Sequence, residues 1–211
     1  MLVKIIKKFS VFCIVMGLIT AAHATGQGGY FGLMVGQSNL HGQNQSVTIS
    51  PGVVETVKPQ GSGVGSSLLA GYNMNEYAAI EGGFIYYSSM SYKTNTFSNN
   101  VKTRAGSFDI LGKGMLPIWD SGFDIFGKLG GAYFFTKTSG KVQSVSIGTS
   151  TSSVFRPMAA IGVSYDMTQN WVADLSYTRL FYSNSQIKYP DFLALGISYH
   201  LLDAKCGQFL C

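Results

Sequence analysis

Apolar and polar residues alternate with a period of two over repeated segments of about ten residues along most of this chain. Such alternation predicts β-strands, because successive side chains of a strand point to opposite faces. Tyr, Phe, Val, Ile and Gly dominate these segments, which favours strands over helices. The eight predicted strands are Gly29–Ser38, Gly63–Tyr72, Tyr77–Tyr87, Thr103–Leu116, Phe123–Lys137, Val154–Tyr165, Trp171–Phe181 and Asp191–Leu201.

The connections between these strands alternate in length. Three are short and turn-like, at residues 73–76, 117–122 and 166–170. Four are longer and rich in Ser, Thr, Asn, Gln and Gly, at residues 39–62, 88–102, 138–153 and 182–190. An up-and-down meander would gather all the long loops at one end and both termini at the other. This arrangement predicts an all-β protein, an eight-stranded antiparallel up-and-down transmembrane β-barrel of the outer-membrane type.

Apart from Arg104, Lys137 and Arg179 near the long loops, the charged residues of the predicted strands share one face of each strand. Glu81, for example, lies opposite Ile80 and Phe84. A charge facing lipid at the membrane centre costs about 2–4 kcal/mol, so we expect the charged and small residues inside and the bulky residues outside. A soluble ligand-binding barrel would have the reverse orientation. The expected interior charges are Glu81, Asp109, Lys113, Asp124, Lys128, Arg156 and Asp174.

These interior charges are nearly balanced in sign, so we expect them to pair, because an unpaired buried charge is costly. Eight strands leave room only for packed side chains, which predicts a plugged or very narrow barrel. Aromatic residues gather near both strand ends, as in the interfacial belts of membrane barrels. The expected belts contain Tyr72, Tyr77, Phe123, Tyr165, Trp171 and Tyr199 at the short turns, and Phe84, Tyr86, Phe135, Phe155, Tyr177 and Phe181 near the long loops.

The first 24 residues have the pattern of a secretory signal peptide: a lysine-rich start, an apolar run, and Ala22-His23-Ala24 as a cleavage site. We therefore expect a barrel over residues 25–201 and a short periplasmic tail over 202–211. Removing three signal lysines lowers the formal net charge from +5 to +2, so nucleic-acid binding is not predicted. Cys206 and Cys211 in the tail either form a disulfide or remain free thiols.

The sequence predicts no enzyme, no cofactor and no metal site. After signal removal only His41 and His200 remain, and the predicted topology places them at opposite ends of the barrel. Neither stands in a serine–histidine–acid arrangement, and two distant histidines with a C-x4-C tail lack zinc-ligand spacing. The low share of charged residues, 12%, and the many aromatic residues also exclude a disordered chain.

The long-loop end carries more basic than acidic residues. Lys102, Arg104, Lys137 and Arg179 lie near the ends of the predicted strands there. Because anionic headgroups attract basic side chains, we expect these four residues to contact lipopolysaccharide in the outer membrane. The loops at residues 39–62, 88–102, 138–153 and 182–190 are the expected contact points for host or other surface ligands.

Several segments resemble the OmpA-like outer-membrane barrels and the opacity-type surface antigens. Tyr30–Gly36 resembles the first strand of that family, and Gly71–Tyr77 with Glu81–Gly83 resembles its first hairpin. Lys113–Ile118 and Lys128–Gly131 resemble its fourth and fifth strands, and Leu195–Tyr199 resembles its closing strand. The resemblance implies a surface-exposed outer-membrane protein of a Gram-negative bacterium. As a departure from full-length members of that family, we expect no peptidoglycan-binding domain after the barrel. The resemblance leaves open a structural or adhesive role, a narrow porin-like channel gated by the interior charges, and, more remotely, a lipid-modifying enzyme.

Overall fold

The computed structural model describes residues 27–42, 45–50, 53–57, 59–92, 100–142, 145–184 and 187–201. The predicted signal peptide, residues 1–24, and the tail with Cys206 and Cys211 lie outside these residues. Both therefore stay predictions.

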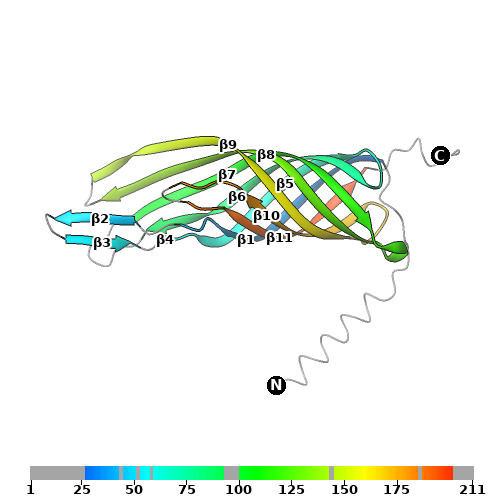
Figure 1. Ribbon diagram of the computed structural model, residues 1–211, viewed down its shortest axis with the longest axis horizontal. Coiled ribbons are helices and arrows are strands. Elements are labelled where there is room, and N and C mark those ends of the chain that lie inside the picture. Colours follow the sequence, from blue (N-terminus) through cyan, green and yellow to red (C-terminus); the bar gives the residue numbers. More distant parts are fainter. Residues whose placement is uncertain are drawn as a thin grey trace, which may run out of the picture.

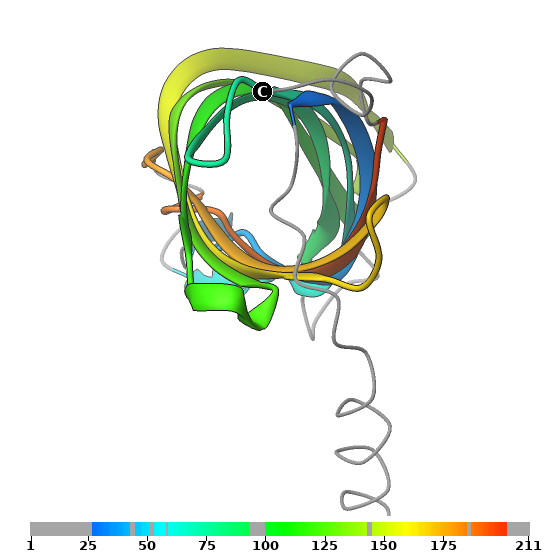
Figure 2. The same cartoon turned by 90° about the vertical axis from the view of Figure 1, so that its right-hand side faces the viewer.

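Eight long antiparallel strands form a closed barrel, seen end-on as a ring in Figure 2. The barrel strands are β1 (Gly28–Asn39), β5 (Ser62–Asn73), β6 (Ala78–Tyr92), β7 (Asn100–Pro117), β8 (Phe123–Val142), β9 (Val145–Asp166), β10 (Trp171–Leu180) and β11 (Asp191–His200). Each pairs with the next in this order, and β1 pairs with β11 to close the ring. The predicted fold class is confirmed. No helix in the described part of the chain is long and apolar enough to cross a membrane.

The three short connections, the start of β1 and the end of β11 lie at one end of the barrel, on the right in Figure 1, which we call the turn end. In the β5–β6 turn, the side-chain carbonyl of Asn75 accepts hydrogen bonds from the backbone N–H groups of Tyr77 (2.9 Å) and Ala78 (2.8 Å). The β7–β8 connection contains the 3-10 helix η1 (Trp119–Ser121) and ends on Gly122 at φ 72°. The opposite end, with the longer connections, is the loop end.

The long connections are more regular than the sequence predicts. Residues 138–153 belong mostly to β8 and β9, which continue as a ribbon beyond the rest of the barrel (Figure 1). Residues 39–62 contain β2 (Gln45–Ser50), β3 (Val53–Val57) and β4 (Pro59–Gln60), and residues 88–102 include the ends of β6 and β7. The predicted loops were therefore too long and the predicted strands too short. The reason is that both faces of a strand can be polar where the strand extends beyond the lipid.

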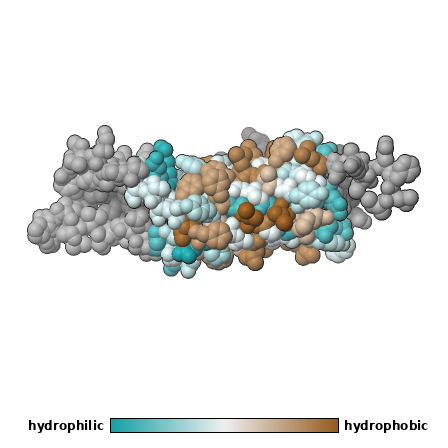
Figure 3. Space-filling view, turned by 90° about the horizontal axis from the view of Figure 1, so that it is seen from above, coloured by the Kyte–Doolittle hydropathy of each residue, from teal (hydrophilic) through white to brown (hydrophobic). Residues whose placement is uncertain are grey.

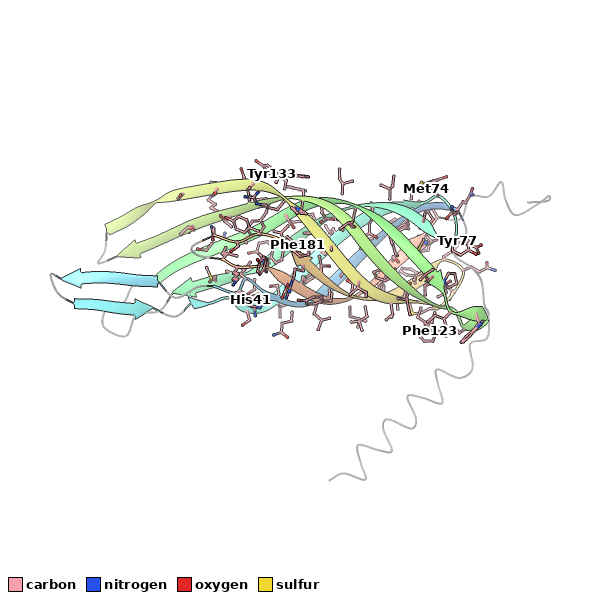
Figure 4. All side chains as sticks on the ribbon, viewed as in Figure 1. His41, Met74, Tyr77, Phe123, Tyr133 and Phe181 are labelled. Atoms are coloured by element: carbon pink, nitrogen blue, oxygen red, sulfur yellow. The ribbon has the colours of Figure 1, made fainter. Side chains whose placement is uncertain are left out.

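The outside of the barrel is apolar, as the strand pattern predicts. Phe155, Leu195 and Leu129 are 66%, 64% and 70% exposed, and hydrophobic side chains gather in the middle of the face shown in Figure 3, with hydrophilic residues toward both ends. Tyr77 and Phe123 project outward at the turn end, and Tyr133 projects outward toward the loop end (Figure 4). From Phe155 to Tyr165, ten steps of about 3.3 Å on a strand tilted by about 45° cover roughly 23 Å, close to the height of a membrane barrel's apolar band.

Candidate functional site

Glu81 is the centre of a charged layer inside the barrel. It is buried on β6, where it forms an ion pair with Lys128 of β8 and accepts a hydrogen bond of 2.9 Å from the hydroxyl of Tyr30 on β1. These three residues project inward because each lies on the same strand face as the buried residues two positions away. The ion pair therefore links strands that do not share backbone hydrogen bonds.

Lys113 and Asp174 are also buried in this layer. The ammonium group of Lys113 lies 4.5 Å from the centroid of the Phe126 ring, at a distance typical of a cation–π contact. The carboxylate of Asp174 accepts a 3.0 Å hydrogen bond from Ser198. Aromatic rings and hydroxyl groups thus supplement the single direct interior ion pair that the described residues contain.

The other three predicted interior charges have different surroundings. Asp109 is buried, and its Oδ2 atom has no hydrogen-bond partner among the described residues. It lines a cavity of about 20 Å³ together with Glu81 and Lys128, which is room for about one water molecule. Asp124 is only half-buried. Arg156 lies on the inward-facing side of β9 but is exposed, so its assignment as a buried interior charge needs correction: β9 extends beyond its neighbour β10 at this point.

A second interior layer, toward the loop end, is apolar. We call it the apolar plug; its main members are Leu40, Tyr87, Met90, Phe134, Tyr182 and Ile187, all buried. Leu40, Tyr182 and Ile187 come from connections and fold into the mouth of the barrel. The centroid of the Phe134 ring lies 5.2 Å from the centroid of the Tyr182 ring and 5.9 Å from that of the Tyr87 ring. Strand alternation places Tyr87 on the same face as Glu81 and Phe134 on the same face as Lys128, whereas no pattern in the polar connections predicts that Leu40, Tyr182 and Ile187 join this layer.

The two histidines stay apart, as expected from the topology. At the loop end, the Nδ1 atom of His41 lies 3.1 Å from the carbonyl oxygen of Tyr189, and its Nε2 atom lies 3.8 Å from a carboxylate oxygen of Asp191. His200 is buried inside the barrel, where its ring stacks on that of Tyr30 at 4.7 Å.

Ser198, His200 and Asp174 are neighbours but do not form the arrangement of a catalytic triad. The Ser198 hydroxyl lies 3.3 Å from Nε2 of His200 and donates to Asp174, so the serine stands between the other two. In a triad the carboxylate orients the histidine, and the histidine activates the serine. The described residues also contain no group of three or more His, Cys, Asp or Glu side chains that could hold a metal ion.

On the outside, Arg104 and Lys137 are directly opposite each other on β7 and β8, and both side chains are exposed. We call them the rim pair. Just below them, the outward rings of Phe84, Phe108 and Phe135 form a cluster with centroid separations of 4.8, 5.8 and 6.2 Å. Two positive charges therefore lie at the edge of this aromatic patch that is nearer the loop end.

The other two predicted lipopolysaccharide contacts are not part of this arrangement. Arg179 is on β10, where its guanidinium group donates hydrogen bonds of 2.7 and 2.8 Å to the two carboxylate oxygens of Asp191. Its charge is largely compensated by that carboxylate. The side chain of Lys102 lies outside the described part of the structure.

The sequence model of the protein family described as the OmpA-like transmembrane domain matches residues 25–204 of this chain. The chain belongs to this family. An OmpA-like relative, the outer membrane protein A of Serratia marcescens, is 31% identical over 150 residues, which are 64% of this chain and 39% of that protein. An uncharacterized protein of Coxiella burnetii is 29% identical over 171 residues, 65% of this chain and 68% of the relative. The chain thus spans about two fifths of the Serratia protein that it matches.

Solved outer-membrane barrels share the fold. OprG of Pseudomonas aeruginosa has a TM-score of 0.53 at 10% identity, covering 84% of this chain and 99% of OprG. The attachment invasion locus protein (Ail) of Yersinia pestis, in complex with the heparin analogue sucrose octasulfate, has a TM-score of 0.51 at 14% identity, covering 82% of this chain and 99% of Ail. This OmpA-like chain is therefore an eight-stranded outer-membrane barrel.

Proposed function

We propose that this OmpA-like protein is a surface protein of the outer membrane whose rim pair, Arg104 and Lys137, binds phosphate groups of lipopolysaccharide. The observation that carries the proposal is the position of two exposed cations on neighbouring strands, directly above an outward aromatic cluster. Aromatic side chains of membrane barrels lie at the headgroup level, and basic side chains attract anionic headgroups there. The rim pair then stands at the height of the lipid phosphates.

Charge distribution near the rim pair supports an anionic ligand. The strand regions beside it contain no acidic residue: β7 has only Asp109, which faces the interior, and β8 has only Asp124, near the turn end. Arg179, in contrast, already has Asp191 as its partner. The Yersinia Ail protein binds a sulfated ligand on the same fold, and lipopolysaccharide phosphates are anions of similar kind.

The interior favours a surface role over a narrow channel. An ion crossing the barrel would have to pass both the Glu81–Lys128 pair and the apolar plug. An apolar layer offers an ion no replacement for its hydration shell, which makes transfer costly. The described residues also present no catalytic arrangement on the outer surface, so a lipid-modifying activity has no structural support.

The test is lipopolysaccharide co-purification with the double variant Arg104→Ala/Lys137→Ala. We expect the amount of lipopolysaccharide bound per barrel to fall in this variant. We also expect the remaining binding to depend less on salt concentration than in the native protein, because the exposed charges that salt screens have been removed. The matched control is Arg156→Ala/Lys188→Ala, which removes two exposed positive charges from the loop end and leaves the rim pair intact. Equal losses in both double variants, or no loss in the first, would contradict the proposal.

A further inference from the structure

The loop-end part of β9 is a strand with only one partner. From Val145 to Arg156 it pairs with β8, whereas its pairing with β10 begins at Met158. Figure 1 shows this part of β9 along the outer edge of the sheet that protrudes at the loop end. Among the described residues, no strand pairs with the second edge of this segment.

Backbone groups of alternate residues point out of this edge. The N–H of Phe181 donates a 3.0 Å hydrogen bond to the carbonyl oxygen of Pro157, so the backbone of Pro157 faces away from β8. The backbone N–H and C=O groups of successive residues in a strand point to alternate sides. Those of Thr151, Ser153 and Phe155 therefore point to the same side as the backbone of Pro157. Their N–H and C=O groups therefore form an open row, and Pro157, which has no N–H, ends it.

Between a bulge beyond Ser150 and the pair Arg156-Pro157, residues 150–155 of this edge lack the usual protection against pairing with another chain. Natural edge strands carry charged residues, prolines or bulges that prevent such contacts. Residues 150–155 of β9 contain no charge and no proline, and the nearest bulge lies beyond Ser150. Ser150, Thr151, Ser152 and Ser153 are all exposed. The open row is therefore suited to pairing with a further strand.

We propose that this edge of β9 binds an extended, acidic segment of another protein by adding it as a strand to the protruding sheet. In this mode of recognition, backbone hydrogen bonds supply affinity and side chains beside the edge supply specificity. Exposed positive charges stand on both faces here: Lys137 on the outer face, directly opposite Thr151, and Arg156 on the inner face. The only acidic residues of β8 and β9, Asp124 and Asp166, lie at the turn end.

A second copy in the same membrane does not fit this edge as well. Strands of membrane barrels tilt by about 45° from the membrane normal. Two copies that face each other in one membrane are related by a rotation about that normal. Their β9 strands then tilt in opposite directions and cross at roughly a right angle, so they cannot form a ladder of backbone hydrogen bonds. A flexible segment of another protein has no such restriction.

The experiment uses the folded protein in lipid nanodiscs without lipopolysaccharide, which separates it from the rim-pair proposal. The probe is a fluorescent peptide of about ten residues with alternating valine and glutamate, and its binding is followed by anisotropy. The variant Thr151→Pro removes one N–H from the free edge but leaves the pairing of β9 with β8 intact. Pro157, whose backbone points to the same side, is likewise accommodated in the β8–β9 ladder. The control Thr151→Val keeps that N–H.

We expect the peptide to bind the native protein and Thr151→Val alike, and to bind Thr151→Pro about tenfold or more weakly. A matched peptide with lysine in place of glutamate should not bind. The heat-induced shift in gel mobility checks that each variant is a folded barrel. Equal binding to folded Thr151→Pro, equal binding of the lysine peptide, or no saturable binding to the native protein would each overturn the proposal.

Discussion

Lys128 and Glu81 form a buried ion pair inside the barrel although they belong to β8 and β6, which are separated by β7. The carboxylate of Glu81 also accepts a hydrogen bond from the hydroxyl group of Tyr30. One acidic residue thus connects three strands through side chains alone. The layer that it centres lies next to the apolar plug, so the interior has a polar half and an apolar half.

We predict a strong loss of stability when one member of this pair is removed. Glu81→Gln leaves the ammonium group of Lys128 without its partner, and breaking a buried pair typically costs about 3–5 kcal/mol. The double variant Glu81→Gln/Lys128→Met removes both charges and should recover part of that loss. Urea unfolding of the barrel in lipid vesicles measures the free energies. Additive effects of Glu81→Gln and Lys128→Met would show that the two side chains do not stabilise each other.

We predict that the native barrel conducts no ions in a planar bilayer, because the apolar plug fills its mouth. The variant Tyr182→Ala/Ile187→Ala shortens two plug side chains that come from the β10–β11 connection. If the plug is the main barrier, this variant should show discrete openings. The control Glu81→Gln/Lys113→Met alters the charged layer and keeps the plug, so it should stay silent. Openings in the native protein, altered in that control, would instead support a pore controlled by the interior charges.

We predict that the exported chain begins at Thr25. The motif Ala22-His23-Ala24 places small residues at the two positions that signal peptidase reads. Intact-mass measurement of protein purified from outer membranes tests this site. The variant Ala24→Arg should accumulate as the uncleaved precursor, whereas Ala24→Ser should be processed normally. A mature chain with a different first residue would move the boundary of the signal peptide.

Several elements of this fold were predictable from the sequence because they follow from local rules. Strand alternation placed Glu81 inside and Phe84 outside, since neighbours of opposite parity cannot share a face. The same rule oriented the aromatic residues, and the short turns located the turn end. These predictions depend only on the two-residue period of a strand and on the high cost of charges in lipid.

The extent of the loop-end strands was not predictable in the same way. Residues 138–153 have a polar composition that is typical of a loop, yet β8 and β9 pair almost throughout this range. A hydrophobic face defines a strand in the sequence only where one side meets an apolar medium. Beyond the membrane both faces of these strands meet water. Backbone hydrogen bonds between β8 and β9 therefore determine the structure there, and no local pattern in the sequence predicts them.

The sequence by itself determined the barrel class, the membrane-facing side and the inward position of Glu81, Asp109, Lys113, Lys128 and Asp174, because each depends on residues next to one another in the chain. Only the tertiary structure decided which charges meet, that Leu40, Tyr182 and Ile187 enter the barrel mouth, and that Arg104 stands beside Lys137 while Arg179 binds Asp191. These contacts depend on how far each strand is shifted along its neighbour. That shift is set by closure of the whole barrel and not by any one segment.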